Sequence, residues 1–369
     1  MSLKEANVNI HVIATGAGAG LQERLWATPG CSAYFSGATF PYAAEEQEEV
    51  LGFMPEHFCS KEAAVDLASA AYMKAYRFGG KAPIGVGITA TVASEEEHKG
   101  DHRFFACLIS NDQALMLHRV IDKGKGEYKR YMDGKHCDSA GFFMIEDALK
   151  VESPTGLVYE DVSDLAKERF FARPFFGANG QRLAKVPFKD QLWALMPGAY
   201  NPPHEGHIGV AEQVFKQFHR IPAYEITAEP PHKDALTVQQ LLQRAKLLHG
   251  GDRLFTRKEP FYLDKARVFP GVPLVLGADA VDRIMDPKWG LDVSCMLKEF
   301  EALGTKLYVA GRLVDGKWMS GHDIIQKHRD AIGEHIEVFR EIYGRWDISS
   351  TEIRNKQEES NEKADVCSG

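Results

Sequence analysis

The chain reads Pro197-Gly198-Ala199-Tyr200-Asn201-Pro202-Pro203-His204-Glu205-Gly206-His207 between an apolar run, 192–196, and a helical pattern that begins at Ile208. A strand that turns directly into a helix exposes backbone N–H groups at the positive end of the helix dipole, and such groups bind phosphate. Gly198 and Gly206 allow a phosphate to approach the backbone closely. His204 and His207 stand three residues apart, so both are expected to face one pocket. In the alternative interpretation the two histidines form no common site, because one ring lies in the core and the other on the surface.

A second polar pattern, Ile348-Ser349-Ser350-Thr351-Glu352-Ile353-Arg354, lies about one domain further along the chain. Ser and Thr at a helix start cap backbone donors. An Arg one turn later offers paired donors to phosphate oxygens. Taken alone, the pattern is also typical of an ordinary capping box. The two patterns together, in this order, favour a nucleotide-binding site.

The first pattern resembles the G-x-F-x-P-x-H-x-G-H signature of adenylyl- and cytidylyltransferases, and the second resembles the I-S-S-T-x-I-R motif of the same superfamily. The resemblance implies a Rossmann-like nucleotidyltransferase domain with a parallel sheet over residues 190–356. It implies that the catalytic residues are His204, His207 and Arg354, which neutralise the triphosphate as pyrophosphate leaves. The implied contacts to ATP and its phosphates are Gly198, Ala199, Tyr200, Gly206, Ser349, Ser350 and Thr351. Ala199 stands where the family often has Ser or Thr.

Three further patterns resemble nicotinamide or nicotinate mononucleotide adenylyltransferases: 229–233 with a following helix, 276–279 with a later Trp, and 308–312. The implied substrate-binding residues are His232, Lys233, Gly277, Asp279, Trp289 and Arg312. An indole face can stack on a cationic pyridine ring, although Trp289 also fits a core position and 232–233 also fits a surface turn. Asp279 ends a predicted parallel strand, where folds of this class bind ligands.

The resemblance implies a reaction that joins ATP to a pyridine mononucleotide and gives a NAD-type dinucleotide plus pyrophosphate. The acceptor phosphate is already a nucleophile, so catalysis requires positioning and charge stabilisation. We expect Mg²⁺ to arrive with ATP, because Mg²⁺ relies on substrate phosphates and water more than on protein ligands. No other metal is expected. Two alternatives remain open: another phosphorylated acceptor such as pantetheine phosphate, or a non-catalytic nucleotide-binding regulator.

Residues 1–150 resemble the C-terminal domain of the CinA family, whose active members deamidate nicotinamide mononucleotide. The likeness rests on 29–39, on Cys59-Ser60 and on 86–89. Active members carry E-S-C-T-G-G after the first strand, where this chain has Thr15-Gly16-Ala17-Gly18-Ala19-Gly20, and their Lys is replaced near Gln47. We therefore expect a catalytically degenerate domain that serves as a scaffold or forms a homo-oligomer. The glycines lack the third Gly of a dinucleotide fingerprint.

Composition bounds the remaining possibilities. A chain of 369 residues predicts two α/β domains, and 44% hydrophobic with 26% charged residues describes a globular protein. The formal net charge of −8 argues against a nucleic-acid-binding surface. No apolar run approaches the roughly 20 residues of a membrane span. The start lacks a signal-like apolar core, and the six Cys are dispersed, so we expect no membrane association and a cytoplasmic location.

Hydrophobic periodicity gives the expected elements. Strands are predicted at 10–14, 84–89 and 104–109 and a helix at 60–78, followed by an irregular linker at 151–189. The second domain is predicted to hold strands at 192–196, 224–227, 273–277, 306–310 and 335–339, with a helix at 237–249. Alternating strands and helices predict parallel sheets covered on both faces. The polar tail 357–369 is predicted to be disordered.

Overall fold

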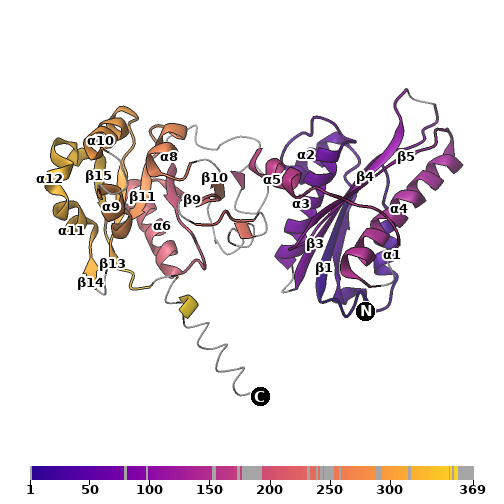
Figure 1. Cartoon of the computed structure of the whole chain (residues 1–369), viewed down its shortest axis with the longest axis horizontal. Coiled ribbons are helices and arrows are strands. Elements are labelled where there is room, and N and C mark those ends of the chain that lie inside the picture. Colours follow the sequence, from indigo (N-terminus) through magenta and orange to yellow (C-terminus); the bar gives the residue numbers. More distant parts are fainter. Residues whose placement is uncertain are drawn as a thin grey trace, which may run out of the picture. The chain divides into compact units, whose positions relative to one another are not determined.

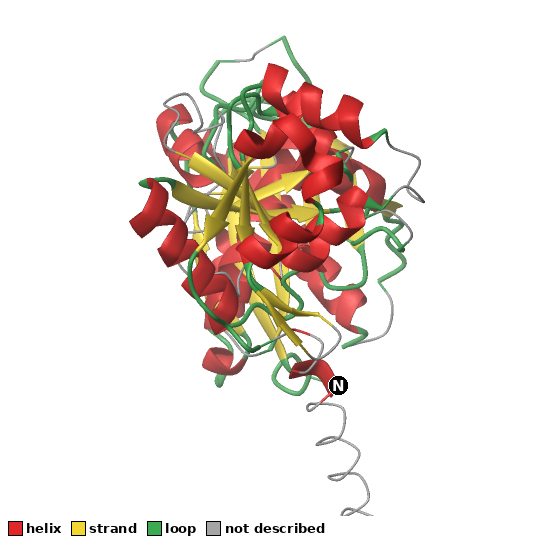
Figure 2. Ribbon diagram, turned by 90° about the vertical axis from the view of Figure 1, so that its left-hand side faces the viewer, coloured by secondary structure: helices red, strands yellow, loops and turns green. Residues whose placement is uncertain are grey.

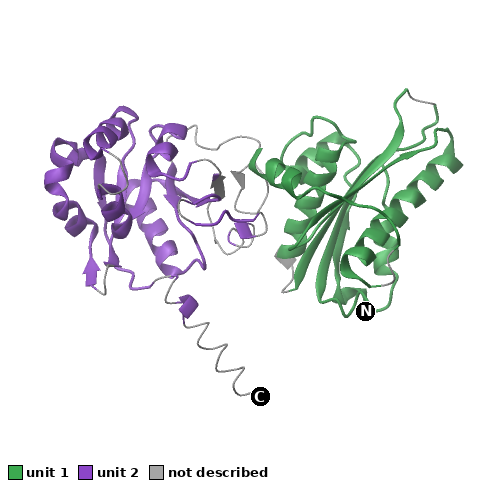
Figure 3. Ribbon diagram, in the orientation of Figure 1, with its two compact units in different colours: residues 1–173, 181–184 green, residues 174–180, 185–369 purple. Residues whose placement is uncertain are grey.

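The computed structural model of the chain describes residues 2–78, 81–96, 99–151, 155–172, 175–176, 193–230, 233–237, 240–241, 244, 253–256, 259–286, 292–314, 317–348, 350 and 353–355. The chain divides into two compact units (Figure 3). Unit 1 comprises Met1–Arg173 and Gln181–Ala184, and unit 2 comprises Pro174–Gly180 and Lys185–Gly369. Among the described residues, no helix is both long enough and apolar enough to cross a membrane.

Unit 1 is built on a six-stranded sheet in the order β2-β1-β3-β4-β5-β6 (Figure 1). Its strands are β1 (Val8–Thr15), β2 (Phe35–Thr39), β3 (Ala82–Thr91), β4 (His102–Ile109), β5 (Ala114–Ile121) and β6 (Glu160–Asp161). Its helices are α1 (Gly20–Trp26), α2 (Ala44–Leu51), α3 (Lys61–Phe78), α4 (Glu127–Leu149) and α5 (Ser163–Ala172), with a 3₁₀ turn η1 (Cys31–Ala33).

The sheet of unit 1 is mixed. β1 pairs in parallel with β2 and β3, but β4, β5 and β6 run antiparallel to their neighbours. The expected parallel pairing is therefore present among β1, β2 and β3 but not among β4, β5 and β6. The physical reason is the short connections: only residues 110–113 separate β4 from β5, whereas a parallel pair requires a crossover of a dozen residues or more.

Helices cover both faces of this sheet. Every residue of β1 is buried, as a central strand between two helical layers requires. One face packs on α1 and α4 through a large apolar cluster, and the other packs on α3. The contact of α3 with β3 is close, since a Cβ at Gly85 or Gly87 would overlap the backbone of Ala68. Small residues at this crossing let the helix approach the sheet.

Residues 151–189 are not wholly irregular. They contain β6, α5 and β7 (Phe175–Phe176), and α5 packs on α3. Arg169 of α5 forms an ion pair of 2.5 Å with the buried carboxylate of Asp66 in α3. The prolines and glycine of this region made a helix hard to predict from the sequence. The ion pair between Arg169 and Asp66 helps to hold α5 against α3.

Unit 2 is built on a seven-stranded sheet in the order β15-β12-β11-β8-β9-β10-β7. Its strands are β7, β8 (Trp193–Pro197), β9 (Ile221–Thr227), β10 (Arg253–Thr256), β11 (Leu274–Gly277), β12 (Leu307–Ala310) and β15 (Phe339–Ile342), with a separate hairpin of β13 (Arg312–Val314) and β14 (Lys317–Met319). Its helices are α6 (Glu205–Phe218), α8 (Tyr262–Val268), α9 (Ala278–Met285), α10 (Val293–Ala302), α11 (Gly321–Lys327) and α12 (Arg329–Ile332), with a 3₁₀ helix η4 (Gly333–Val338).

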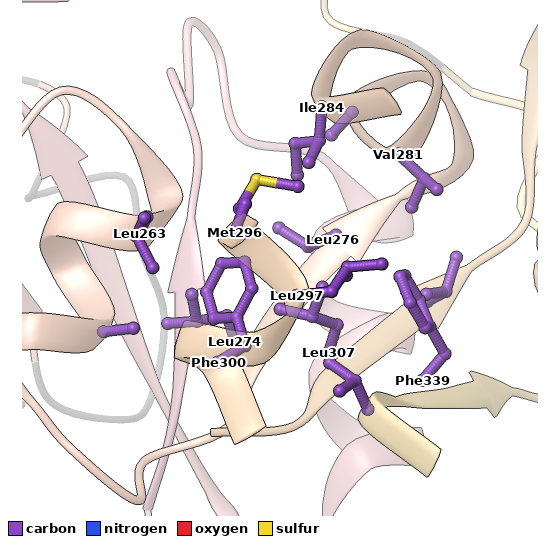
Figure 4. Close-up of a cluster of buried hydrophobic side chains, with 14 of the residues drawn as sticks. Leu263, Leu274, Leu276, Val281, Ile284, Met296, Leu297, Phe300, Leu307 and Phe339 are labelled. Atoms are coloured by element: carbon purple, nitrogen blue, oxygen red, sulfur yellow. The ribbon is translucent and has the colours of Figure 1, made fainter. Parts of the chain in front are cut away.

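The six strands from β15 to β10 are parallel, and β7 adds an antiparallel edge. The predicted parallel sheet of this domain is confirmed. Red helices flank the yellow strands in Figure 2. One face packs on a core cluster that includes Leu274, Leu297, Phe300 and Leu307, drawn in Figure 4. α6 contacts β9 and β15.

One predicted strand of this domain is misplaced. Residues 335–338 lie in η4, and the strand begins only at Phe339. Both His335 and Val338 are buried, and the His335 ring lies 2.8 Å from Glu301 of α10, so contact with α10 shapes this segment. β10 and the β13–β14 hairpin were not anticipated. The predicted helix 237–249 is largely outside the described residues, as is the tail 357–369.

Candidate active site

A tight turn joins β8 to α6 at the carboxyl end of the sheet of unit 2. Its first amide, Gly198 N–H, donates to the carbonyl of Glu225 in the neighbouring strand at 2.9 Å. Tyr200 adopts a left-handed φ of 46° and folds its ring under the turn, where its hydroxyl donates to Met196 O at 2.5 Å. A Cβ at Gly198 would lie 2.7 Å from that ring. The glycine is thus required by the turn's own packing.

The burial of Tyr200 limits its predicted role. The side chain is 1% exposed, and its ring packs edge-on against Tyr224 and His207. Contact with a phosphate is therefore left to the Tyr200 backbone. The ring supports the turn from below.

His204 and His207 lie together at the start of α6. His204 is the residue that precedes the helix, and its backbone N–H donates to His207 Nδ1 at 3.1 Å. The two rings stack with centroids 3.8 Å apart. Because Nδ1 accepts, the proton of a neutral His207 ring is on Nε2, where it can be donated to a ligand.

The surroundings of His207 determine its charge state. Burial, and then the neighbouring His204 and Arg312, lower the pKa of His207 from 6.5 to about 3. The unliganded ring is therefore neutral at pH 7 and acts as an N–H donor. Positive charge at this site comes from arginines.

Residues 343–348 lie along α6, and Ser350 and Arg354 of the second sequence motif contact the turn that holds the first. Ser350 Oγ donates to Pro202 O at 2.7 Å, and the guanidinium of Arg354 donates to Asn201 O. Trp346 occupies the space at which a Gly209 side chain would lie. Two glycines of α6 permit this crossing, since a Cβ at Gly206 would be 3.0 Å from Ile348 Cγ2. Ser349 and Thr351 are outside the described residues.

Arg244, in the helix that follows the 229–233 pattern, formed part of the sequence resemblance but was not among the predicted site residues. Its Nη1 donates to Ala199 O at 3.1 Å. Burial and then the nearby guanidinium of Arg354 lower the pKa of Arg244. Two like charges held near one turn favour a polyanion between them. The available signal was a lone Arg in the predicted helix after 229–233.

Asp279, Arg312 and Arg283 form the second part of the site. Gly277 ends β11 and precedes α9, and Asp279 stands in the first turn of that helix. Its carboxylate accepts from Arg312 Nη1 at 3.0 Å and from Arg283 Nη2 at 2.9 Å. Arg283 was not predicted, although its position four residues after Asp279 is the spacing of a helical ion pair.

The Arg312 guanidinium is one of the charges that lower the pKa of His207. The structure does not bring Lys233 to these residues: its side chain is exposed in the turn after β9, and no contact among the described residues joins it to either histidine. His232 and Trp289 lie outside the described residues. Within the described part of the chain, no group of three or more His, Cys, Asp or Glu side chains could hold a metal ion.

The corresponding region of unit 1 has a different chemistry. Thr15 ends β1 with 4% exposure, and its hydroxyl accepts from Gln47 Nε2 at 2.9 Å. A Cβ at Gly16 would overlap Ala90 O. The Asp138 carboxylate lies against the start of α1, since a Cβ at Gly20 would lie 2.1 Å from Asp138 Oδ2. The strand end is thus closed by protein groups.

Different known proteins match the two parts of the chain. Residues 195–356 match the cytidylyltransferase-like family, so this part of unit 2 is a domain of the nucleotidyltransferase superfamily. That assignment supports a nucleotidyltransferase activity. No curated protein matches the chain.

Solved structures of the competence-damaged protein (CinA) superfamily match the N-terminal region. One from Klebsiella pneumoniae is 14% identical, with 39% of this chain and 91% of that chain covered and a TM-score of 0.31. A competence or damage-inducible protein from Enterobacter asburiae is 12% identical, with 42% and 99% covered and a TM-score of 0.31. One from Agrobacterium tumefaciens is 16% identical, with 40% and 95% covered and a TM-score of 0.30.

Proposed function

We propose that the cytidylyltransferase-like domain of unit 2 transfers the adenylyl group of ATP to the phosphate of a pyridine mononucleotide, with release of pyrophosphate. The observation that carries this proposal is the meeting of the two phosphate motifs. Ser350 and Arg354 bond to the backbone of the turn that holds His204. Donors from distant parts of the sequence thus surround one turn.

The polyphosphate of ATP would occupy the turn. His207 would donate from neutral Nε2, and Arg244 and Arg354 would supply positive charge. Charge develops on the α-phosphate as pyrophosphate leaves, and donors held in advance of the reaction stabilise it without reorganisation. Mg²⁺ would arrive with ATP as part of the MgATP substrate, because the proposed donor set consists of cations and N–H groups that do not bind metal cations.

The acceptor would lie toward the carboxyl ends of β11 and β12. Open parallel sheets bind ligands at this edge. The pair of guanidinium groups on Asp279 leaves a net positive group, which suits an acceptor that carries a phosphate dianion. The choice of a pyridine acceptor rests on the sequence resemblance. We place the reaction in the cytoplasm because Cys31, Cys59, Cys107, Cys137 and Cys295 are free thiols.

The test is a pyrophosphate-release assay with the full chain, MgATP and one acceptor at a time. The acceptors are nicotinamide mononucleotide, nicotinate mononucleotide and pantetheine phosphate. Release with either pyridine mononucleotide, together with a dinucleotide product on chromatography, supports the proposal. If pyrophosphate is released only with pantetheine phosphate, the acceptor is pantetheine phosphate and not a pyridine mononucleotide. If none of the three acceptors supports release, the proposed reaction is rejected.

A further inference from the structure

A buried ion pair lies beneath the turn and takes no part in the chemistry described above. Lys265 Nζ is 3.1 Å from both carboxylate oxygens of Glu225, and the side chains are 2% and 0% exposed. Two threonines complete the arrangement: Thr256 Oγ1 donates to Glu225 Oε1 at 2.5 Å, and Thr227 Oγ1 donates to it at 3.0 Å. Lys265 also donates to Thr227 Oγ1 at 2.9 Å and to the carbonyl of Glu259.

Stability does not explain this ion pair. Two charges removed from water lose hydration that their attraction often fails to replace, and apolar residues of similar volume are frequently as stable. The site nevertheless uses every N–H of the Lys265 ammonium. These bonds fix the Lys265 ammonium against Glu225 Oε1, Thr227 and the Glu259 carbonyl, whereas Glu225 Oε2 accepts no hydrogen bond from the described residues.

The position of the pair indicates what it fixes. Glu225 is paired in register with Pro197, the last residue of β8, and its carbonyl accepts from Gly198 N–H. Thr256 is the last residue of β10, and Lys265 belongs to α8. The network therefore joins the ends of two strands and one helix at the point where the phosphate-binding turn leaves the sheet.

We propose that Glu225 and Lys265 are positioning residues, which hold the start of the turn so that His204 and His207 meet the reacting phosphate at the correct distance. This inference rests on the proposed function. Neither residue touches substrate, because both are fully buried. They act through the Gly198 amide and the strand ends. A small displacement of a reacting group costs on the order of 10–100-fold in rate, so the effect falls on turnover.

The test compares two double variants. Glu225→Gln with Lys265→Met removes the charges together and leaves no isolated buried ion, so it is expected to remain folded. The matched control is Arg267→Met with Glu299→Gln, which removes an exposed ion pair that joins α8 to α10, where Arg267 Nε lies 2.6 Å from Glu299 Oε1. The single Lys265→Met variant, with an unpaired buried carboxylate, is expected to show a lower Tm than either.

Two readouts are measured on full-length protein. The buried double variant is expected to lose about 10–100-fold in kcat with little change in KM for ATP, and amides in 197–207 are expected to exchange hydrogen faster. The control is expected to match the wild type in both. The inference is overturned if the Glu225→Gln, Lys265→Met protein is stably folded and has a normal kcat or unchanged amide exchange. If none of the three acceptors supports pyrophosphate release by the wild-type chain, the proposed function fails. Hydrogen exchange of the turn amides then still decides whether the ion pair holds the turn.

Discussion

The charge state of His207 follows from where its ring is held. The ring is largely buried, accepts a hydrogen bond from the His204 backbone and lies near Arg312, and all three conditions disfavour a second proton. A neutral ring still donates from Nε2. In the proposed reaction this ring would contribute a directed hydrogen bond, and Arg244 and Arg354 would supply the positive charge.

Replacing His207 with Ala removes this donor. We expect turnover to fall about 10²-fold, which is the usual effect of deleting one such donor, with a small change in Tm. The measurement is pyrophosphate release together with thermal unfolding. His322→Ala, at an exposed position in α11, is the control and should be silent. A His207→Ala protein with a normal rate but a much lower Tm would assign the residue a structural role.

The hydroxyl of Thr15 lies at the end of β1, next to the loop where the sequence resemblance predicts that unit 1 lacks a nucleophile. It is buried and hydrogen-bonded to the Gln47 amide, which cannot act as a base. We expect no ammonia release from nicotinamide mononucleotide at high protein concentration. The decisive comparison is with Thr15→Val: ammonia production by the wild type that this variant abolishes would prove unit 1 to be active.

His11 gives unit 1 a pH-dependent stability. Burial, and then the nearby Lys74 ammonium, lower the pKa of His11 from 6.5 to about 4. Between these values the unfolded chain binds a proton that the folded chain does not, so stability is complete above pH 6.5 and is lost as the pH falls toward 4. The loss approaches roughly 3 kcal/mol below that pH.

The variant His11→Phe has no titrating ring and should show a flatter dependence of the free energy of unfolding on pH between 6.5 and 4. Urea denaturation at several pH values measures it, with a signal from unit 1. If the free energy of unfolding changes with pH at the same slope in the wild type and in His11→Phe, the His11 ring has an ordinary pKa in the folded state.

At the scale of elements, the contact of 343–355 with α6 decides whether the two phosphate motifs form one site. It depends on a helical glycine, because the Trp346 indole occupies the volume of a side chain at position 209. The segment then continues to Ser350 and Arg354, which bond to the turn. Packing of the Trp346 ring against α6 thus helps to place Ser350 and Arg354, which donate to the turn several residues further along the chain.

Gly209→Ala should displace Trp346 and the residues that follow it. Helix propensity favours Ala over Gly by about 1 kcal/mol, so α6 itself should not be weakened. We expect a higher KM for ATP and a lower kcat. The control is Gly134→Ala in α4, where an added Cβ meets no atom within 4 Å, and it should preserve activity. Normal kinetics of Gly209→Ala would show that the segment tolerates displacement.

At the scale of the whole molecule, the boundary of unit 2 differs from the one that motif positions suggest. β7 pairs with β10 through Phe176↔Arg253 and Phe175↔Leu254. The sheet of unit 2 therefore takes its edge strand from residues that precede 190, the start of the domain expected from the sequence. The described site residues all belong to this unit.

A fragment of residues 174–369 should therefore fold and release pyrophosphate at about the rate of the full chain. A fragment of 186–357 lacks β7 and should unfold at a lower temperature, since its β10 becomes an unpaired edge. Circular dichroism melting and the pyrophosphate assay compare the two. If the longer fragment folds but is inactive while the full chain is active, the site requires unit 1.

The sequence alone was sufficient for the features that depend on neighbouring residues. The apolar run before Gly198 and the helical pattern after His207 specified β8, the turn and α6, because strand, turn and helix propensities act within a few residues. The same local signals placed β1, α3, β9, β11 and β12. They failed at 335–338, where burial against α10 replaced a predicted strand with a 3₁₀ helix.

Only the tertiary structure decided which distant groups meet. Arg244 reaches Ala199 across 45 positions, Arg312 reaches Asp279 across 33, and Lys265 reaches Glu225 across 40. These distances depend on strand order and on helix packing over the sheet, which no local pattern encodes. The neutral state of His207 has the same origin, since desolvation is a property of the packed interior and not of the residue itself.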